Sequence, residues 1–470
     1  MERAKGVEPS TFSLATRRST TELCPLVLIS IENRSFLINY QERNIFKLIK
    51  IYFKKLFLIY IYIVEINEKF KKIIYHYKKN DFEKAEKLLN DQIDNIENKF
   101  LFYKIFSSIY LKQSKWEKFI DSNIKLTEFD QEKTKALCNI GIGNFQLGKI
   151  SKAINYFQLS IKQNYNYEIA LENLAICYKE IGAFKESIKY FLEVIKLNKH
   201  NRKSVSLLID LMKYDVSKFS NNSNLLKINQ NIINLNDQIN HKKLNTNILR
   251  KVIQKSIDYI KSYENNINYN ELQIYRINKK NLNCERHFKV FNKYQIIPKF
   301  CFGCYKVQVT TTNVVELIKL YFLFNENFLN ENPLRKCMVE TRKKVKGNYK
   351  GYIYTQSLHD AENTLKIVNK KILSNNIKIE SIEIKHGCSE YYEKYPKYKN
   401  FRDQNMSYDK NWLKFEKSID NEILSRSKED EKYIGITINK INLSDILIII
   451  NWLKYAKNIG DKTYLKILDN

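Results

Sequence analysis

A regular period of about 34 residues runs through the first half of the chain. Three sets of positions recur at this spacing: turn formers, large apolar residues, and mostly small residues. The sets are Asn80, Ser114, Gly148 and Gly182; Phe82, Trp116, Ile150 and Phe184; and Ala85, Phe119, Ala153 and Ser187. A unit this short cannot bury its apolar face alone, so neighbouring units must stack. The period therefore predicts an all-α solenoid of helical hairpins.

The order of a turn residue, an apolar residue and a small residue resembles the tetratricopeptide repeat over residues of about 66–201. The copy at 168–201 matches at Leu171, Leu174, Ala175, Tyr178, Gly182, Phe184, Ser187 and Phe191. The copy at 134–167 has Asn144 where an aromatic residue is usual, and the copies at 66–99 and 100–133 match less well. The resemblance implies stacked helix–turn–helix units and indicates little about chemistry.

In this family the first helix of each unit lines a concave groove for extended peptides or partner helices. The residues that the resemblance places there are Lys104, Asn139, Ile142, Phe145, Glu172, Ile176 and Lys179. Lys104 and Asn139 resemble two members of the family's clamp for C-terminal carboxylates. Ser108 replaces an asparagine of that clamp, and Ile169 and Asn173 replace two basic residues. The groove therefore predicts a protein or peptide partner of mixed polar and apolar character, without a complete clamp.

Amino-acid composition and charge limit the kinds of partner and cellular environment that the chain could have. The chain has 470 residues and a formal charge of +29, which would suit a polyanionic partner. Lys, Asn, Ile and Tyr dominate while Gly and Pro are scarce, as an A+T-rich genome would produce. Eight cysteines are too few for a disulfide scaffold, which favours a reducing cytoplasm. No run of 18 apolar residues occurs, so a membrane span is not predicted.

The N-terminal segment 1–63 differs from the rest. Met1–Leu26 is rich in Ser, Thr, Arg and Glu and lacks the Asn, Ile and Lys bias found elsewhere. It resembles a peptide produced when a predicted reading frame crosses a transfer-RNA gene. We expect 1–63 to be a spurious or disordered leader, with the natural start near Val64.

The second half predicts an α+β domain. Strand patterns occur at 304–309, 335–342, 352–354 and 381–386, and helical patterns at 313–324 and 358–373. This β-α-β-β-α-β order is that of the ferredoxin-like arrangement, with strands one and two running opposite to strands three and four. The predicted division is 1–63 leader, 64–215 solenoid, 216–282 Asn/Lys-rich linker with a helix at 248–263, 283–400 Cys-containing α+β domain, and 401–470 helical extension. A tail helix at 443–456 should pack on the α+β domain.

Cys301-Phe-Gly-Cys304 is the most distinctive local motif. A two-residue gap lets both sulfurs face one point, and Cys284 and His287 upstream have the same gap. These four residues predict a structural zinc site. Because the predicted strands return His386 and Cys388 to the same sheet edge, either could replace an upstream ligand. A redox dithiol and unligated thiols remain alternatives.

Two other functions stay open at the sequence level. Lys350–Tyr354 is similar to the opening of the strand-three signature of RNA-recognition modules, with Ile353 in place of a small residue. Lys344, Lys350, Tyr352 and Tyr354 would then bind nucleic acid; otherwise the tyrosines are half-buried sheet residues beside a solvated hairpin.

An enzyme with a Cys-centred site within 283–390 is the second alternative. The sequence contains no G-x-S-x-G elbow and no Gly-rich phosphate loop, so no catalytic residues are predicted. The favoured function is a non-enzymatic scaffold that binds a partner segment in the repeat groove.

Overall fold

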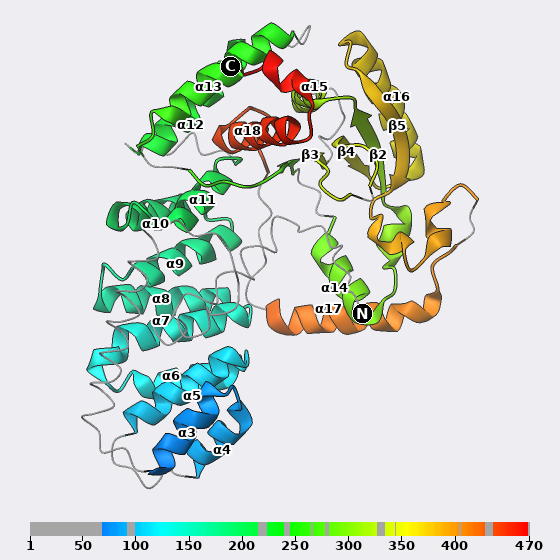
Figure 1. Cartoon of the computed structure of the whole chain (residues 1–470). Helices are drawn as coiled ribbons and strands as arrows, with labels where there is room; N and C mark the ends of the chain where they lie inside the picture. Colours follow the sequence, from blue (N-terminus) through cyan, green and yellow to red (C-terminus); the bar gives the residue numbers. More distant parts are fainter. Residues whose placement is uncertain are drawn as a thin grey trace. The chain divides into compact units, whose positions relative to one another are not determined.

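The computed structural model describes residues 68–91, 99–214, 223–238, 245–264, 267–277, 282–326, 334–343, 345–403, 406–427 and 436–468. The chain divides into two compact units between Asn173 and Leu174. Figure 1 labels the helices and strands of both. The predicted leader, 1–63, lies outside the described residues. Among the described residues, no helix is long and apolar enough to cross a membrane.

The first unit consists of antiparallel helical hairpins. Its helices are α3 (Glu68–Lys78), α4 (Phe82–Asn90), α5 (Phe100–Lys112), α6 (Trp116–Leu126), α7 (Asp130–Gln146), α8 (Ile150–Gln163) and the first part of α9 (Glu168–Glu180). The second helices of successive hairpins begin at Phe82, Trp116 and Ile150, and α10 (Phe184–Leu197) of the second unit begins one period after the last of these. The predicted period is therefore confirmed, and each period corresponds to one helical hairpin.

Backbone conformation explains which residue types occur at the turns between the helices. Asn80, Ser114, Gly148 and Gly182 have φ angles of 60°, 55°, 76° and 75°. Glycine adopts this left-handed region without strain, and asparagine tolerates it better than most residues. After α7, the Lys149 N–H donates to the Asn144 carbonyl at 2.9 Å and the Gly148 N–H to the Phe145 carbonyl at 3.0 Å. These two bonds form a Schellman cap, which ends the first helix and turns the chain into the second.

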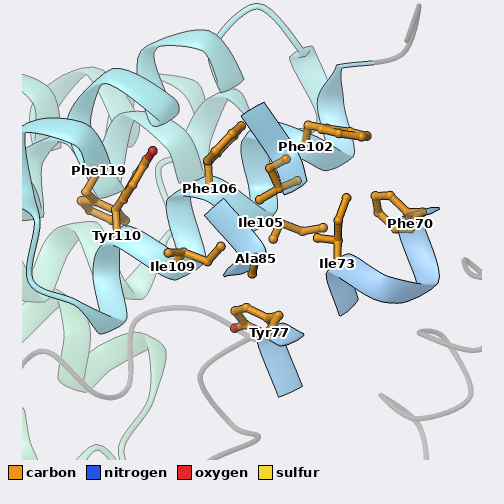
Figure 2. Packing of buried hydrophobic residues seen from close by; sticks show 11 residues of the cluster. Phe70, Ile73, Tyr77, Ala85, Phe102, Ile105, Phe106, Ile109, Tyr110 and Phe119 are labelled. Carbon is orange, nitrogen blue, oxygen red and sulfur yellow. The ribbon is translucent and has the colours of Figure 1, made fainter. Parts of the chain in front are cut away.

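Apolar side chains fill the space between the first hairpins. Figure 2 shows the cluster formed by α3, α4, α5 and α6, which includes Ile73, Ala85, Ile109 and Phe119. Small residues permit close helix contacts in the next hairpin, because a Cβ on Gly141 would lie 2.6 Å from a ring carbon of Phe157. The stacked cores are what hold units of this length in place.

The second unit continues with helices and adds a sheet. After α10 come α11 (Arg202–Leu211), α12 (Asn224–Asn234), the short η3 (Leu235–Gln238) and α13 (Thr246–Lys261), followed by strand β1 (Gln273–Arg276). The predicted linker 216–282 thus contains two α-helices and a strand among its described residues. The predicted helix at 248–263 corresponds to α13.

The sheet contains β2 (Tyr305–Thr311), β3 (Arg335–Val339), β4 (Tyr349–Thr355) and β5 (Ile379–His386) in addition to β1. Its order is β1-β3-β4-β2-β5, and all neighbouring pairs are antiparallel. With α15 (Val314–Asn325) and α16 (Leu358–Ser374), the elements follow one another along the chain as β2, α15, β3, β4, α16 and β5. The edge strand β1 was not predicted.

The second unit also contains further α-helices and short 3-10 helices. They are α14 (Cys284–Tyr294), η4 (Lys299–Gly303), η5 (Glu390–Tyr392), η6 (Pro396–Lys399), η7 (Lys410–Trp412), α17 (Leu413–Ser427), α18 (Leu443–Asn458) and η8 (Lys462–Lys466). A capping box of Asn442 and Asp445 begins α18. The indole N–H of Trp452 donates to the Leu272 carbonyl at 2.8 Å. The predicted packing of the tail helix on the β-containing domain is confirmed.

Candidate functional site

A pocket opens between α5, α6 and α7 of the first unit. Its volume is about 20 Å³, and its lining combines charged, polar and apolar side chains. The lining residues are Lys104, Ser107, Ser108, Leu111, Phe119, Leu126, Glu132, Lys135 and Asn139. Two of the predicted groove residues, Lys104 and Asn139, therefore meet at one pocket.

Charge in the pocket centres on one carboxylate between two lysines. The Lys104 ammonium lies 2.7 Å from a Glu132 oxygen, and the Lys135 ammonium lies 3.9 Å from the other. Lys104 also lies 5.0 Å from the centroid of the Phe100 ring. Both lysine side chains keep about a fifth of their surface exposed. The pocket lining has two lysines and one glutamate, and therefore one more positive than negative charge.

Asn139 has a structural role that the sequence did not indicate. Its side-chain amide donates to Asn123 Oδ1 at 2.9 Å, and Asn123 Nδ2 donates to Ser107 Oγ at 2.7 Å. Asn123 is fully buried. This chain of hydrogen bonds joins α5, α6 and α7 at the base of the pocket. Because buried amides must find partners, Asn139 supports the pocket more than it reaches a ligand.

The other predicted groove residues differ in exposure. Ile142, Glu172 and Ile176 are buried, whereas Phe145 and Lys179 are half-buried. Ile142 and Phe145 lie on α7, Glu172 lies on the part of α9 in the first unit, and Ile176 and Lys179 lie on the part in the second. Phe145 and Lys179 are thus the two with more surface left for a partner.

The predicted zinc ligands belong to the second unit, where His287 packs against an aromatic side chain. The His287 ring stacks on Phe300 with centroids 5.0 Å apart. Burial, together with the nearby charge of Arg286, lowers the pKa of His287 to about 4. The Cys301 thiol instead lies 3.6 Å from the Tyr391 hydroxyl.

Cys388 lies in the same region as Cys301 and Cys304, the region to which the sequence had assigned it. The Gly387 N–H donates to the Cys304 carbonyl at 2.8 Å, and a Cβ on Gly387 would lie 2.5 Å from the Cys304 sulfur. Cys301 and Cys388 belong to one apolar cluster. Burial raises the pKa of Cys304 to about 12 and raises those of Cys301 and Cys388 as well. Burial therefore favours the protonated form of these thiols.

Metal binding requires several ligands directed at one point. Within the described parts of the chain, no three His, Cys, Asp or Glu side chains are arranged so that they could hold a metal ion. The set Cys284, His287, Cys301 and Cys304 is therefore not assembled here, and zinc stays a prediction. The sequence proposed His386 as a substitute; its ring stacks on Tyr398 at 3.9 Å, and burial lowers its pKa to about 4.

The residues of the nucleic-acid alternative lie mainly on β4. Lys344 is outside the described residues. Lys350 is buried, with its ammonium 3.5 Å from Glu340. Tyr352 is buried, Tyr354 is half-buried, and their ring centroids are 6.4 Å apart. The expectation of half-buried tyrosines fits Tyr354 and underestimates the burial of Tyr352.

A buried ionic group that the sequence did not reveal joins three elements of the second unit. Arg276 of β1 donates to both Asp445 oxygens, at 3.1 and 2.7 Å, and to the Tyr321 hydroxyl of α15 at 2.9 Å. Tyr321 donates to Asp445 at 2.8 Å. Because removing one partner would leave a buried charge alone, this group fixes β1 and α18 on the sheet domain.

No family model matches the chain. Over 63 residues the chain is 33% identical to the uncharacterized protein ycf37 of Pyropia yezoensis, a stretch that covers 13% of this chain and 35% of that protein. The chain thus spans about a third of the length of this curated relative.

Similar solved structures include several helical repeat proteins. MamA is 18% identical with a TM-score of 0.29, covering 32% of this chain and 85% of that one. The first TPR of Spaghetti (RPAP3), bound to the HSP90 peptide SRMEEVD, is 22% identical with a TM-score of 0.24, covering 25% and 92%. A tetratricopeptide repeat protein from Parabacteroides merdae ATCC 43184 is 15% identical with a TM-score of 0.29, covering 42% and 66%. Scores this low decide nothing about function.

Proposed function

We propose that the repeat region is a docking module of the tetratricopeptide type, which binds a carboxylate-bearing segment of a partner protein. The pocket between α5, α6 and α7 is the observation that carries this proposal. It presents two ammonium groups beside apolar surface from Leu111, Phe119 and Leu126. A preformed pocket on rigid helices lowers the ordering cost of capturing a flexible segment.

Lys104 is the residue proposed to meet the partner. Its ammonium already pairs with Glu132, so the site is built for a carboxylate. An incoming acidic side chain or C-terminus would exchange with Glu132 or share the lysine with it. The mixed lining agrees with the partner chemistry that the sequence predicted.

A peptide library displayed with free C-termini tests the proposal on the full-length protein. We expect acidic peptides to be enriched, and Lys104→Ala to weaken their binding about tenfold. Lys125→Ala is the matched control, because Lys125 lies on α6 and is 55% exposed in its side chain. Absence of enriched peptides, or equal binding by both variants, would refute the proposal.

We also propose that the second unit contains a ferredoxin-like domain. Zinc binding is a separate prediction for this unit. The expected location of the protein is the cytoplasm. The order from β2 to β5 supports the domain assignment. Metal analysis of the full-length protein tests the zinc. One equivalent that is lost in Cys301→Ser would support it, and a metal-free, folded protein would exclude it.

A further inference from the structure

The sheet of the second unit has one long open edge. Its order is β1-β3-β4-β2-β5, so β1 and β5 are the edge strands. Strand β1 has four residues, and directly after it the Ile277 carbonyl accepts a hydrogen bond from the Thr437 N–H. Strand β5 has eight residues and, in the part of the chain that the structure describes, pairs with β2 alone (Figure 1). Such an edge presents a row of backbone donors and acceptors that can pair with another strand.

Pairing with β2 determines which backbone groups of β5 point outward. The Gly387 N–H donates to the Cys304 carbonyl, which makes these two residues a hydrogen-bonded pair of the antiparallel ladder. Hydrogen-bonded and non-hydrogen-bonded pairs alternate, so Ile384 and Ile382 direct their N–H and C=O groups away from β2. Among the described residues, these groups have no protein partner. The middle of β5 can therefore pair with a further strand.

The two faces of β5 differ in chemistry. Ile382 and Ile384 lie on the apolar face of the sheet, and helix α16 packs on β2 and β5. Glu383 and Lys385 lie on the other face, where the Lys385 ammonium is 2.8 Å from the Glu383 carboxylate. An added strand must match this alternation to continue both faces. The alternation of β5 itself meets the requirement, so a second copy of the strand fits the edge.

Helix α16 extends the apolar side of this edge. Its buried residues Val368 and Ile372 define the side that packs on the sheet. Lys371 lies 3.6 Å from Glu326 at the end of α15, which identifies the flank of α16 that faces α15. By the helical repeat, Leu373 lies on the opposite flank, toward the β5 edge, and it is 67% exposed. A large apolar side chain is thus available beside the open strand.

The charges on the same flank are self-complementary. Glu362 and Lys366 lie there one helical turn apart, and both are exposed. A two-fold axis perpendicular to the sheet makes a second α16 antiparallel to the first and keeps both helix layers on the same side. Glu362 of each copy then faces Lys366 of the other. This charge complementarity favours a second copy over an unrelated strand.

We propose that the chain forms a symmetric dimer in which β5 pairs antiparallel with β5 of a second copy. Ile382 of each strand pairs with Ile384 of the other, so the outward N–H and C=O groups of both strands are used. Glu383 then lies opposite Glu383 of the second copy, and each carboxylate keeps Lys385 of its own strand as a partner. The two sheets become one continuous sheet.

Disulfide trapping in the full-length protein tests this pairing. Directly opposite residues of a non-hydrogen-bonded pair have Cα atoms about 4.5 Å apart, which a disulfide can span. Glu383→Cys should therefore give a covalent dimer on treatment with diamide, and mass spectrometry should identify the linked peptides. Ser381→Cys is the matched control, because it lies on the same face but opposite Lys385 of the second copy. It should give at least tenfold less covalent dimer.

Sedimentation velocity measures the dimer without a cross-link. The mass of the wild type should rise from 56.2 kDa toward twice this value as the concentration increases. Ile384→Pro removes an outward N–H and should weaken association at least tenfold, since an edge strand tolerates proline where the N–H points away from the sheet. Leu373→Lys should also weaken it. Ile367→Lys, an equivalent change on the α15 side of the same helix, should not.

Circular dichroism verifies that each variant is folded. A wild type that stays monomeric at every concentration would overturn the proposal. Equal cross-linking of Glu383→Cys and Ser381→Cys would do the same, as would a dimer that both Ile384→Pro and Leu373→Lys leave unchanged.

Discussion

Reciprocal substitutions at equivalent turns test how the period specifies the hairpins. Ser114 and Gly148 occupy the same position in successive repeats, and both have positive φ angles, 55° and 76°. A non-glycine residue in this region costs about 1 kcal/mol relative to glycine. Ser114→Gly should therefore stabilise the repeat region by about 1 kcal/mol, and Gly148→Ser should destabilise it by a similar amount.

Thermal and urea unfolding followed by far-ultraviolet circular dichroism measure both effects. The first unfolding transition should shift by about 2–4 °C, upward for Ser114→Gly and downward for Gly148→Ser. Ser114→Ala is the control, because it removes the hydroxyl and keeps the strained backbone. Its stability should stay close to that of the wild type. Shifts of the same sign in the two reciprocal variants would refute the argument from backbone conformation.

Three further predictions concern the second unit. Arg276→Met leaves Asp445 buried without its partner and should lower the free energy of unfolding in urea by about 3–5 kcal/mol. The double variant Arg276→Met, Asp445→Leu should recover much of this loss. An unchanged urea midpoint in Arg276→Met would contradict this prediction. The unfolded His386 takes up a proton near pH 6.5 that the folded ring accepts only near pH 4. Stability should therefore fall by about 3 kcal/mol as the pH falls between these values, and His386→Phe should flatten that dependence. The raised pKa values of Cys301 and Cys304 should make both thiols react with Ellman's reagent at pH 8 at least tenfold more slowly in folded than in denatured protein, as peptide mapping would show.

Local sequence signals predicted the parts of the fold that local physics decides. The turns at Gly148 and Gly182 were predictable because their backbone conformation requires such residues. The strands β2 and β4 were predictable because their residues alternate between an apolar and a polar face. In both cases, the constraint acts over a few residues and therefore leaves a mark in the sequence.

Contacts between distant segments could not be predicted in the same way. Strand β1 is four residues long and is fixed by Arg276, whose partner Asp445 is 169 residues away. The link between Asn139 and Asn123 depends on how three helices pack, and a buried asparagine has no periodic signature. Spacing suggested His287 as a companion of Cys301, but the fold stacks that ring on Phe300.

Affinity of a Glu132→Gln variant for a selected acidic peptide tests the central claim most directly. If the partner's carboxylate competes with Glu132 for Lys104, removing the internal competitor should tighten binding by about five- to tenfold, which corresponds to about 1 kcal/mol for a partly exposed ion pair. Fluorescence anisotropy with the labelled peptide measures this. Weaker binding by Glu132→Gln, to the same degree as by Lys104→Ala, would contradict the account.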